Sequence, residues 1–310
     1  MICVNYVFVY MYSLIGMEEN LIDSSKYKIG LVSLDTRFAS SRGCGNGEFK
    51  INLPRNMRNV MRIRMASAEI PLVAYGFSLE NGNTTFAVKL GSNQTFAKCT
   101  PIPDGNYSIS KLTNAIEVSL QNLHSGFSVS FNAVTGRLTI QNSSLPFEMY
   151  LASYEKRIAT RPADWGIGYN IGFRKFKVKA EPQLGGGYFI QGSTVLSLQA
   201  APYYLLQLRC PDAVENVTHP VLDDGYLTAF AKVILKDNAY TYQFDDNSNL
   251  LRKEFTYLAP HSIPYFFVRL MNVWGDTVDM QDIDWSLTIE VTEVVNSKTF
   301  ATISNTYSRG

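Results

Sequence analysis

An excess of charge of either sign is missing from this 310-residue sequence, which has 28 Lys and Arg residues against 27 Asp and Glu residues. A protein that packages nucleic acid must neutralise many phosphates with basic side chains, so a net charge of +1 argues against genome binding as the main function. Long apolar runs are missing too. The uncharged stretch at residues 7–16 is well short of the roughly 20 residues needed to span a bilayer, and no basic region precedes it.

Cysteine is scarce, and no Cys-x-x-Cys pair occurs. Small disulfide-stapled proteins use cysteine far more densely, so we expect buried free thiols and a reducing compartment. The four cysteines are Cys3, Cys44, Cys99 and Cys210.

Motifs of catalysis are absent as well. The three histidines, His124, His219 and His261, are scattered and show no zinc-binding spacing. No nucleophile elbow, Walker motif or dinucleotide-binding glycine motif occurs. We therefore predict no catalytic residue, no cofactor, no metal and no small-molecule substrate. One acidic cluster before a strand, Asp279, Asp282 and Asp284, fits either a glycosidase carboxylate pair or ordinary turn and cap residues, and the second interpretation is favoured.

The apolar N-terminus is interpreted as an arm that packs on the body or on a neighbouring subunit. A signal peptide, a membrane anchor and an upstream start before Met17 are the alternatives. The candidate interface residues of this arm are Val7, Phe8, Tyr10, Tyr12 and Leu14.

A basic strand face is predicted near residue 60. Residues 57–65 alternate so that Met61 and Ile63 point one way, while Arg58, Arg62 and Arg64 point the other. These three arginines complete the candidate interface, as a contact with acidic protein or lipid. A solvated strand face is the alternative.

One helix and one hairpin are predicted in the first half. The turn at Pro103 to Gly105 is followed by a candidate N-cap, Ser108 or Ser110, and by an apolar i, i+4 stripe that predicts a helix at about 109–123. Residues 127–141 alternate around a glycine-containing loop, which predicts a β-hairpin.

The second half is dominated by strands, which favours an all-β fold, an antiparallel β-sandwich of jelly-roll type with a minor α+β insertion. The predicted strands are 195–199, 203–209, 228–235, 255–258, 265–271 and 285–291. The predicted divisions are an arm and loop at 1–47, first strands at 48–80, an α+β insertion at 81–175, the remaining strands at 176–295 and a tail at 296–310.

The order of several short motifs resembles the minor capsid proteins of large icosahedral double-stranded DNA viruses, including algal viruses, iridoviruses and giant viruses. The similarity runs from about Asp35 to Val295 and rests on collinear order, since no single motif is diagnostic. The motifs are Leu34–Arg37, Phe49–Pro54, Met65–Pro71, Ile102–Tyr107, Thr135–Ile140, a degraded Leu-Gly-Phe box at Gly168–Phe173, and Trp274–Glu290.

This resemblance implies a structural virion protein that stabilises the icosahedral shell through protein–protein contacts. It implies the major capsid protein and other minor capsid proteins as partners, assembly in the host cytoplasm and proximity to an internal viral membrane, with no specific nucleic acid. The competing hypothesis is a carbohydrate- or receptor-binding β-sandwich, because exposed Tyr and Trp side chains on a sheet can stack on sugars.

Overall fold

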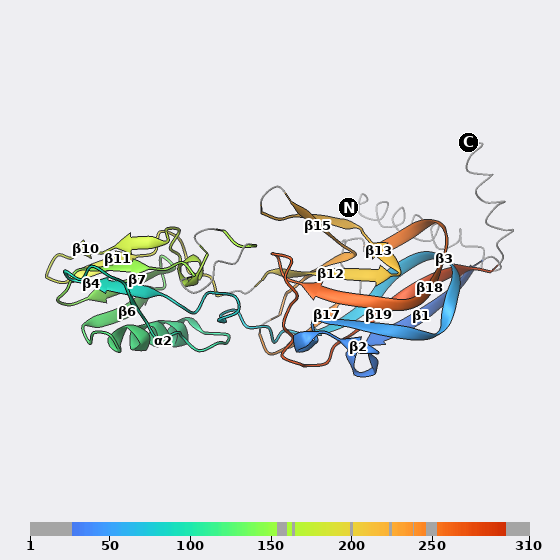
Figure 1. Ribbon diagram of the computed structural model, residues 1–310, viewed down its shortest axis with the longest axis horizontal. Coiled ribbons are helices and arrows are strands. Elements are labelled where there is room, and N and C mark those ends of the chain that lie inside the picture. Colours follow the sequence, from blue (N-terminus) through green and yellow to red (C-terminus); the bar gives the residue numbers. More distant parts are fainter. Residues whose placement is uncertain are drawn as a thin grey trace, which may run out of the picture.

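A computed structural model describes residues 27–153, 160–162, 165–198, 201–222, 225–237, 239–245 and 253–295. These residues form two lobes, a curled sheet and a smaller inserted lobe beside it (Figure 1). No helix in the described part of the chain is long and apolar enough to cross a membrane.

The sheet lobe is one antiparallel sheet of nine described strands. Its main path runs β1-β19-β3-β18-β12-β13, with β2 and β17 paired to β3, and β16 paired to β12. The strands are β1 (Tyr27–Asp35), β2 (Ser41–Arg42), β3 (Glu48–Pro71), β12 (Tyr203–Cys210), β13 (Asp212–Val214), β16 (Ala231–Ile234), β17 (Tyr242–Asp245), β18 (Glu254–Met271) and β19 (Ser286–Val294).

Two long strands make this sheet curl around its own core. β3 and β18 pair along most of their length, but their register shifts three times between Thr256 and Tyr265. Pro260 and Pro264 lie in this irregular stretch, where a missing backbone donor is tolerated. The curled sheet therefore encloses apolar side chains as a sandwich does, and its centre includes an edge-to-face contact between Phe49 and Trp285 at 5.1 Å.

The inserted lobe lies between β3 and β12 and has its own apolar core, from Phe77 to Leu198. Two four-stranded sheets, β5-β4-β8-β9 and β10-β11-β7-β6, and helix α2 surround this core. The elements are β4 (Ala87–Leu90), β5 (Ala97–Lys98), α2 (Ile109–Gln121), β6 (Phe127–Asn132), β7 (Arg137–Asn142), β8 (Phe147–Tyr150), α3 (Ile167–Asn170), β9 (Lys177–Lys179), β10 (Glu181–Pro182) and β11 (Tyr188–Gln191).

Short elements complete the described chain. The 3-10 helices η1 (Thr36–Phe38) and η2 (Cys44–Asn46) precede β3, and β14 (Val217–Pro220) pairs with β15 (Tyr226–Ala229).

The predicted antiparallel all-β class is confirmed, although the nine described strands of the sheet lobe belong to one curled sheet rather than to two separately hydrogen-bonded sheets. Helix α2 matches the predicted helix: Ser108 Oγ accepts the hydrogen bond of Lys111 N at its start, and Leu112, Ile116 and Leu120 are buried. The hairpin β6–β7 also matches its prediction.

Three predicted boundaries differ from the structure. Residues 195–198 form no strand, and the strand predicted at 228–235 is divided between β15 and β16 at the buried Phe230. The predicted division between residues 175 and 176 falls inside the inserted lobe, because β9 pairs with β8 and β11 pairs with β7. The strand after this predicted division, β9, completes a sheet of the inserted lobe and is not the first of the remaining sandwich strands.

Candidate functional site

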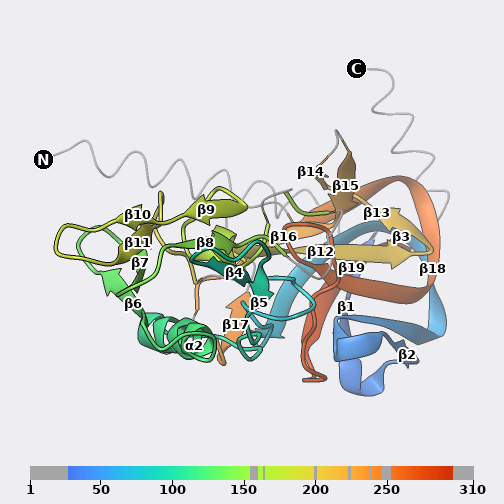
Figure 2. The same cartoon turned by 60° about the vertical axis from the view of Figure 1, so that its left-hand side comes forward.

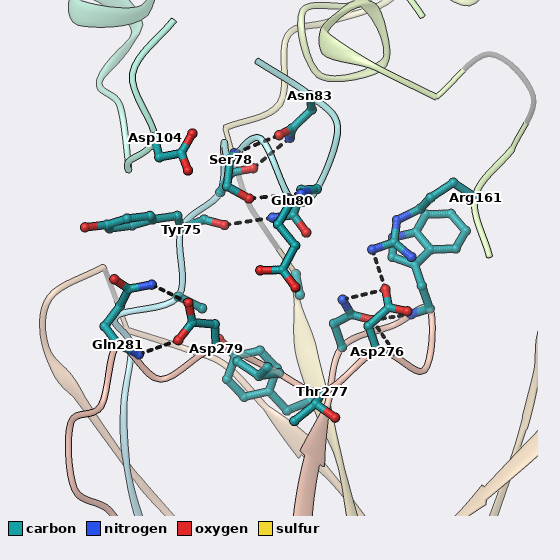
Figure 3. A pocket seen from close by; sticks show the side chains of 18 of the residues that line it. Tyr75, Ser78, Glu80, Asn83, Asp104, Arg161, Asp276, Thr277, Asp279 and Gln281 are labelled. Atoms are coloured by element: carbon teal, nitrogen blue, oxygen red, sulfur yellow. Dashed lines mark hydrogen bonds and ion pairs between the residues drawn. The ribbon is translucent and has the colours of Figure 1, made fainter. Parts of the chain in front are cut away.

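A hollow with a volume of about 650 Å³ lies where the two lobes meet (Figure 3). One wall is the connection that follows β3, at residues 74–83, and the opposite wall is the loop between β18 and β19, at residues 272–281. Arg161 and Trp165 close one side. Residues far apart in the sequence thus surround one cavity.

Arg161 joins the inserted lobe to the sheet lobe. Its side chain is 3% exposed, and its Nη2 lies 2.6 Å from Oδ2 of Asp276, in the β18–β19 loop. The guanidinium carbon lies 5.3 Å from the ring centroid of Trp165 and 5.1 Å from that of Trp274, and the two rings meet edge to face at 5.4 Å, so the arginine packs against an aromatic pair. Burial lowers the pKa of Arg161, and Asp276 opposes this shift; an arginine remains charged under such conditions.

The loop that presents Asp276 is shaped by its own sequence. Asn272 Oδ1 accepts hydrogen bonds from the backbone N of Trp274 and of Asp276, at 2.9 and 3.1 Å. Gly275, between them, has a φ of 87°, a left-handed conformation that favours glycine. On the other wall, Trp165 Nε1 donates to Asn81 O at 2.6 Å. The cavity is therefore bordered by groups that hold the two lobes together.

Most carboxylates around the cavity are engaged by their own chain. Asp104 Oδ1 accepts the backbone N–H of Leu79 at 2.9 Å, and Asp279 accepts from the backbone and side chain of Gln281 at 2.8 and 2.7 Å. Glu80 is exposed and points into the cavity (Figure 3). Carboxylates that cap loops are poor candidates for acid–base chemistry.

The acidic cluster before β19 consists of turn residues. Asp282 has a φ of 56° and lies in the turn that Asp279 caps. Asp284 faces elsewhere, because its Oδ1 accepts from Thr36 Oγ1 at 2.8 Å and lies 3.3 Å from Arg42 Nη1. The structure thus supports the turn-and-cap interpretation over a glycosidase pair.

Metal ligands do not gather in the described ranges, where no three His, Cys, Asp or Glu side chains could hold an ion. Burial raises the pKa of the Cys99 thiol to about 12. Burial also raises the pKa of Cys210 to about 11, although a hydrogen bond with Tyr257 opposes the shift. These thiols stay protonated near neutral pH and are therefore poor nucleophiles. Cys44, in contrast to the predicted burial, is exposed because it lies in the surface turn η2.

The predicted basic face contains an internal ion-pair network. Glu290 lies 2.5 Å from Arg64 Nη2 and 3.4 Å from Arg62 Nη2, and Glu254 lies 3.9 Å from Arg62 Nη1. Acidic partners for two of the three arginines thus come from β18 and β19 of the same chain.

Arg58 lies beyond two irregularities of β3. Asn59 has a φ of 57°, and the register with β19 shifts between Arg62 and Val60, which is fully buried. The predicted alternation through residues 57–65 is therefore broken, and exposed Arg58 is not part of the described network around Glu290. The other candidate interface residues, Val7, Phe8, Tyr10, Tyr12 and Leu14, lie outside the described residues.

The sequence did not predict the junction formed by Arg161, Trp165, Trp274 and Asp276. The motif containing Trp274 and Asp276 was noticed, but no local pattern connects it with Arg161. Thr160, next to Arg161, is 116 positions from Asp276 and also contacts it, at 3.4 Å. The contact between the inserted lobe and the β18–β19 loop, which is a feature of the tertiary structure, brings these positions together.

Comparisons with known proteins gave little. No family model and no curated protein match the chain. Among solved structures, the chain is similar to the crystal structure of SeMet-labelled mavirus penton protein, at 10% sequence identity and a TM-score of 0.41, over 87% of this chain and 100% of that chain. A likeness at this level carries no argument about function.

Proposed function

We propose that this chain is a non-enzymatic structural virion protein, a minor capsid protein that stabilises an icosahedral shell through protein–protein contacts. The collinear motifs that resemble minor capsid proteins support the proposal. The observation that carries it is that polar side chains of these motifs form hydrogen bonds with other parts of the same chain.

The first motif fastens the start of the sheet lobe. Asp35 accepts the backbone N–H of Arg37 at 2.8 Å and also binds its guanidinium, which holds the pKa of Asp35 below its usual range. Thr36 Oγ1 donates to Asp284 and accepts the backbone N–H of Trp285 at 3.1 Å. This motif therefore connects the first and last parts of the described chain.

The motif at residues 102–107 fastens the junction of the lobes. Asn106 Oδ1 accepts from Gly76 N at 2.7 Å, and its Nδ2 donates to Ala74 O at 3.2 Å. Gly105 and Phe77 exchange two backbone hydrogen bonds, at 2.8 and 3.1 Å. These hydrogen bonds hold the segment that follows β3 in place. The polar groups of the motif therefore have a structural role.

The C-terminal motif anchors the core. Trp285 is 2% exposed, and its Nε1 donates to Asn46 O at 2.8 Å. Because the motif side chains form hydrogen bonds within the chain, the fold is rigid. A rigid fold suits a structural subunit that presents a fixed surface to its neighbours.

The proposal is tested by assembly. The full chain and a variant without residues 1–16 are expressed with the other capsid proteins, and their incorporation into gradient-purified particles is measured by quantitative mass spectrometry. We expect stoichiometric incorporation of the full chain and reduced incorporation of the deletion variant, whose body still folds. The matched control replaces Arg137 with Gln, an exposed charge change on the inserted lobe. Absence of the full chain from purified particles would overturn the proposal.

A further inference from the structure

One face of the inserted lobe combines uncompensated positive charge with a row of aromatic rings. It is the outer face of the sheet β5-β4-β8-β9, whose four strands are visible in Figure 2. We call it the β9 face and define it by Phe96, Tyr150, Lys175, Phe176, Lys177 and Lys179.

Strand register places Tyr150, Lys177 and Lys179 on the solvent side. Val178 and Met149 are paired in the sheet and pack in the lobe's core. Their neighbours therefore point outward, with Lys177 opposite Tyr150 and Lys179 opposite Glu148. Lys177 and Lys179 are exposed, as is Lys175 just before the strand.

The rings form a row beside the ammonium group of Lys177. Phe96 and Tyr150 meet edge to face at 6.1 Å, and Tyr150 meets Phe176 in the same way at 6.2 Å. Lys177 Nζ lies 5.6 Å from the centroid of Phe96 and 6.0 Å from that of Phe176. Cation–π contacts thus restrain this lysine while leaving its ammonium group at the surface.

Acidic side chains do not compensate this charge. Glu148 lies within the sheet but is bound by Lys89 at 2.6 Å. Within the described part of the chain, no carboxylate pairs with Lys175, Lys177 or Lys179. The face is locally cationic although the whole chain is nearly neutral.

Protection of a sheet edge explains only part of this arrangement. β9 is an edge strand, and lysines on edge strands prevent pairing with other chains. Lys175 precedes the strand, however, and Phe176 is 51% exposed, which adds an apolar contact that edge protection does not need. The combination resembles a binding surface.

We infer that the β9 face binds a linear sulfated polysaccharide. Lysine ammonium groups are point charges that suit successive sulfate groups without a fixed geometry. Lys177 and Lys179 are about 7 Å apart along β9, and Lys175 lies just before the strand, so the three ammonium groups can meet more than one anionic group of a linear chain. Exposed Phe176 offers an apolar surface to a sugar ring.

Two other anionic partners fit less well. Single-stranded nucleic acid binds where aromatic faces are free to stack on successive bases, whereas these rings meet at interplanar angles of 70° and 60° and Lys177 lies over two of them. An anionic membrane requires a broader apolar surface than the one strongly exposed apolar residue of this face. This inference is independent of the capsid proposal.

The test measures binding of the full chain to immobilised heparin, with dextran, oligo(dT) and phosphatidylserine vesicles as comparison probes, at several salt concentrations. We expect heparin binding that weakens as salt rises, no binding to dextran, and at least tenfold weaker heparin binding when Lys175, Lys177 and Lys179 are all replaced with Gln. The matched control replaces Arg55, Lys111 and Arg137 with Gln, which removes the same charge elsewhere and should change heparin binding less than twofold.

A second variant separates ligand binding from edge protection. Lys177→Glu with Lys179→Glu keeps the edge charged, and so soluble, but should abolish heparin binding. Equal binding by the triple Gln variant and its control would overturn the inference. Preferential binding to oligo(dT) or to vesicles would overturn it too, by assigning the face to nucleic acid or to a membrane.

Discussion

Replacement of Arg161 with Ala should loosen the junction between the two lobes. The arginine packs against the contacting rings of Trp165 and Trp274 and reaches Asp276 across the boundary. Because its side chain is almost fully buried, water cannot replace these contacts without opening the junction. The change should therefore act first on lobe docking, and only secondarily on either apolar core.

The expected loss is about 3 kcal/mol. Each cation–π contact in a desolvated position contributes about 1 kcal/mol. The ion pair adds only about 1 kcal/mol, since the Asp276 side chain is 41% exposed and regains hydration when its partner is lost. At 1.4 kcal/mol for each factor of ten, the ratio of docked to undocked lobes falls by about a hundredfold.

Hydrogen exchange measured by mass spectrometry follows this change directly. We expect faster exchange in the loop at residues 272–281 and a larger radius of gyration by small-angle X-ray scattering. Arg174→Ala is the control, because Arg174 also lies over an aromatic ring, Tyr169 at 4.2 Å, but is exposed and lies outside the junction. Unchanged exchange in this loop for Arg161→Ala would refute the junction role.

Two further predictions concern buried groups. Lys253 and Asp245 form an ion pair in which both side chains are 1% exposed. Lys253→Met alone should lower the free energy of unfolding by about 3 to 5 kcal/mol, because the buried carboxylate of Asp245 loses this ion pair. Lys253→Met combined with Asp245→Leu should lower it by less than either single change. Urea unfolding measures this, and strictly additive losses would contradict it. Exposed Cys44 should react with iodoacetamide at pH 8 in the folded chain, while buried Cys99 and Cys210 should not. Burial raises the pKa of Cys99 to about 12 and that of Cys210 to about 11, so both thiols are protonated at pH 8. Labelling of Cys99 as fast as Cys44 would show that its burial is wrong.

Local patterns were predictable from the sequence, whereas long-range pairing was not. Helix α2 has an N-cap at Ser108 and an apolar stripe within thirteen residues, so its own sequence specifies it. The hairpin β6–β7 is equally local. β1 was missed because it is an edge strand whose exposed Ile29 and Leu31 interrupt the expected alternation.

The long strands were underestimated for a different reason. Prolines at 260 and 264 favour a break, and two short strands were predicted where β18 continues through bulges. Pairing with β3 on both sides of the irregular stretch overrides the local signal. The candidate interface shows the same limit, because the acidic partners of Arg62 and Arg64 lie on β18 and β19, more than 160 positions away.

The central claim, a structural role in a virion shell, is tested most directly by a cryo-electron microscopy reconstruction of the intact particle at a resolution that traces the chain. The account predicts density for the curled sheet and the inserted lobe at repeated positions within the icosahedral shell, in contact with other capsid proteins. A reconstruction that accounts for all shell density with other chains would contradict it.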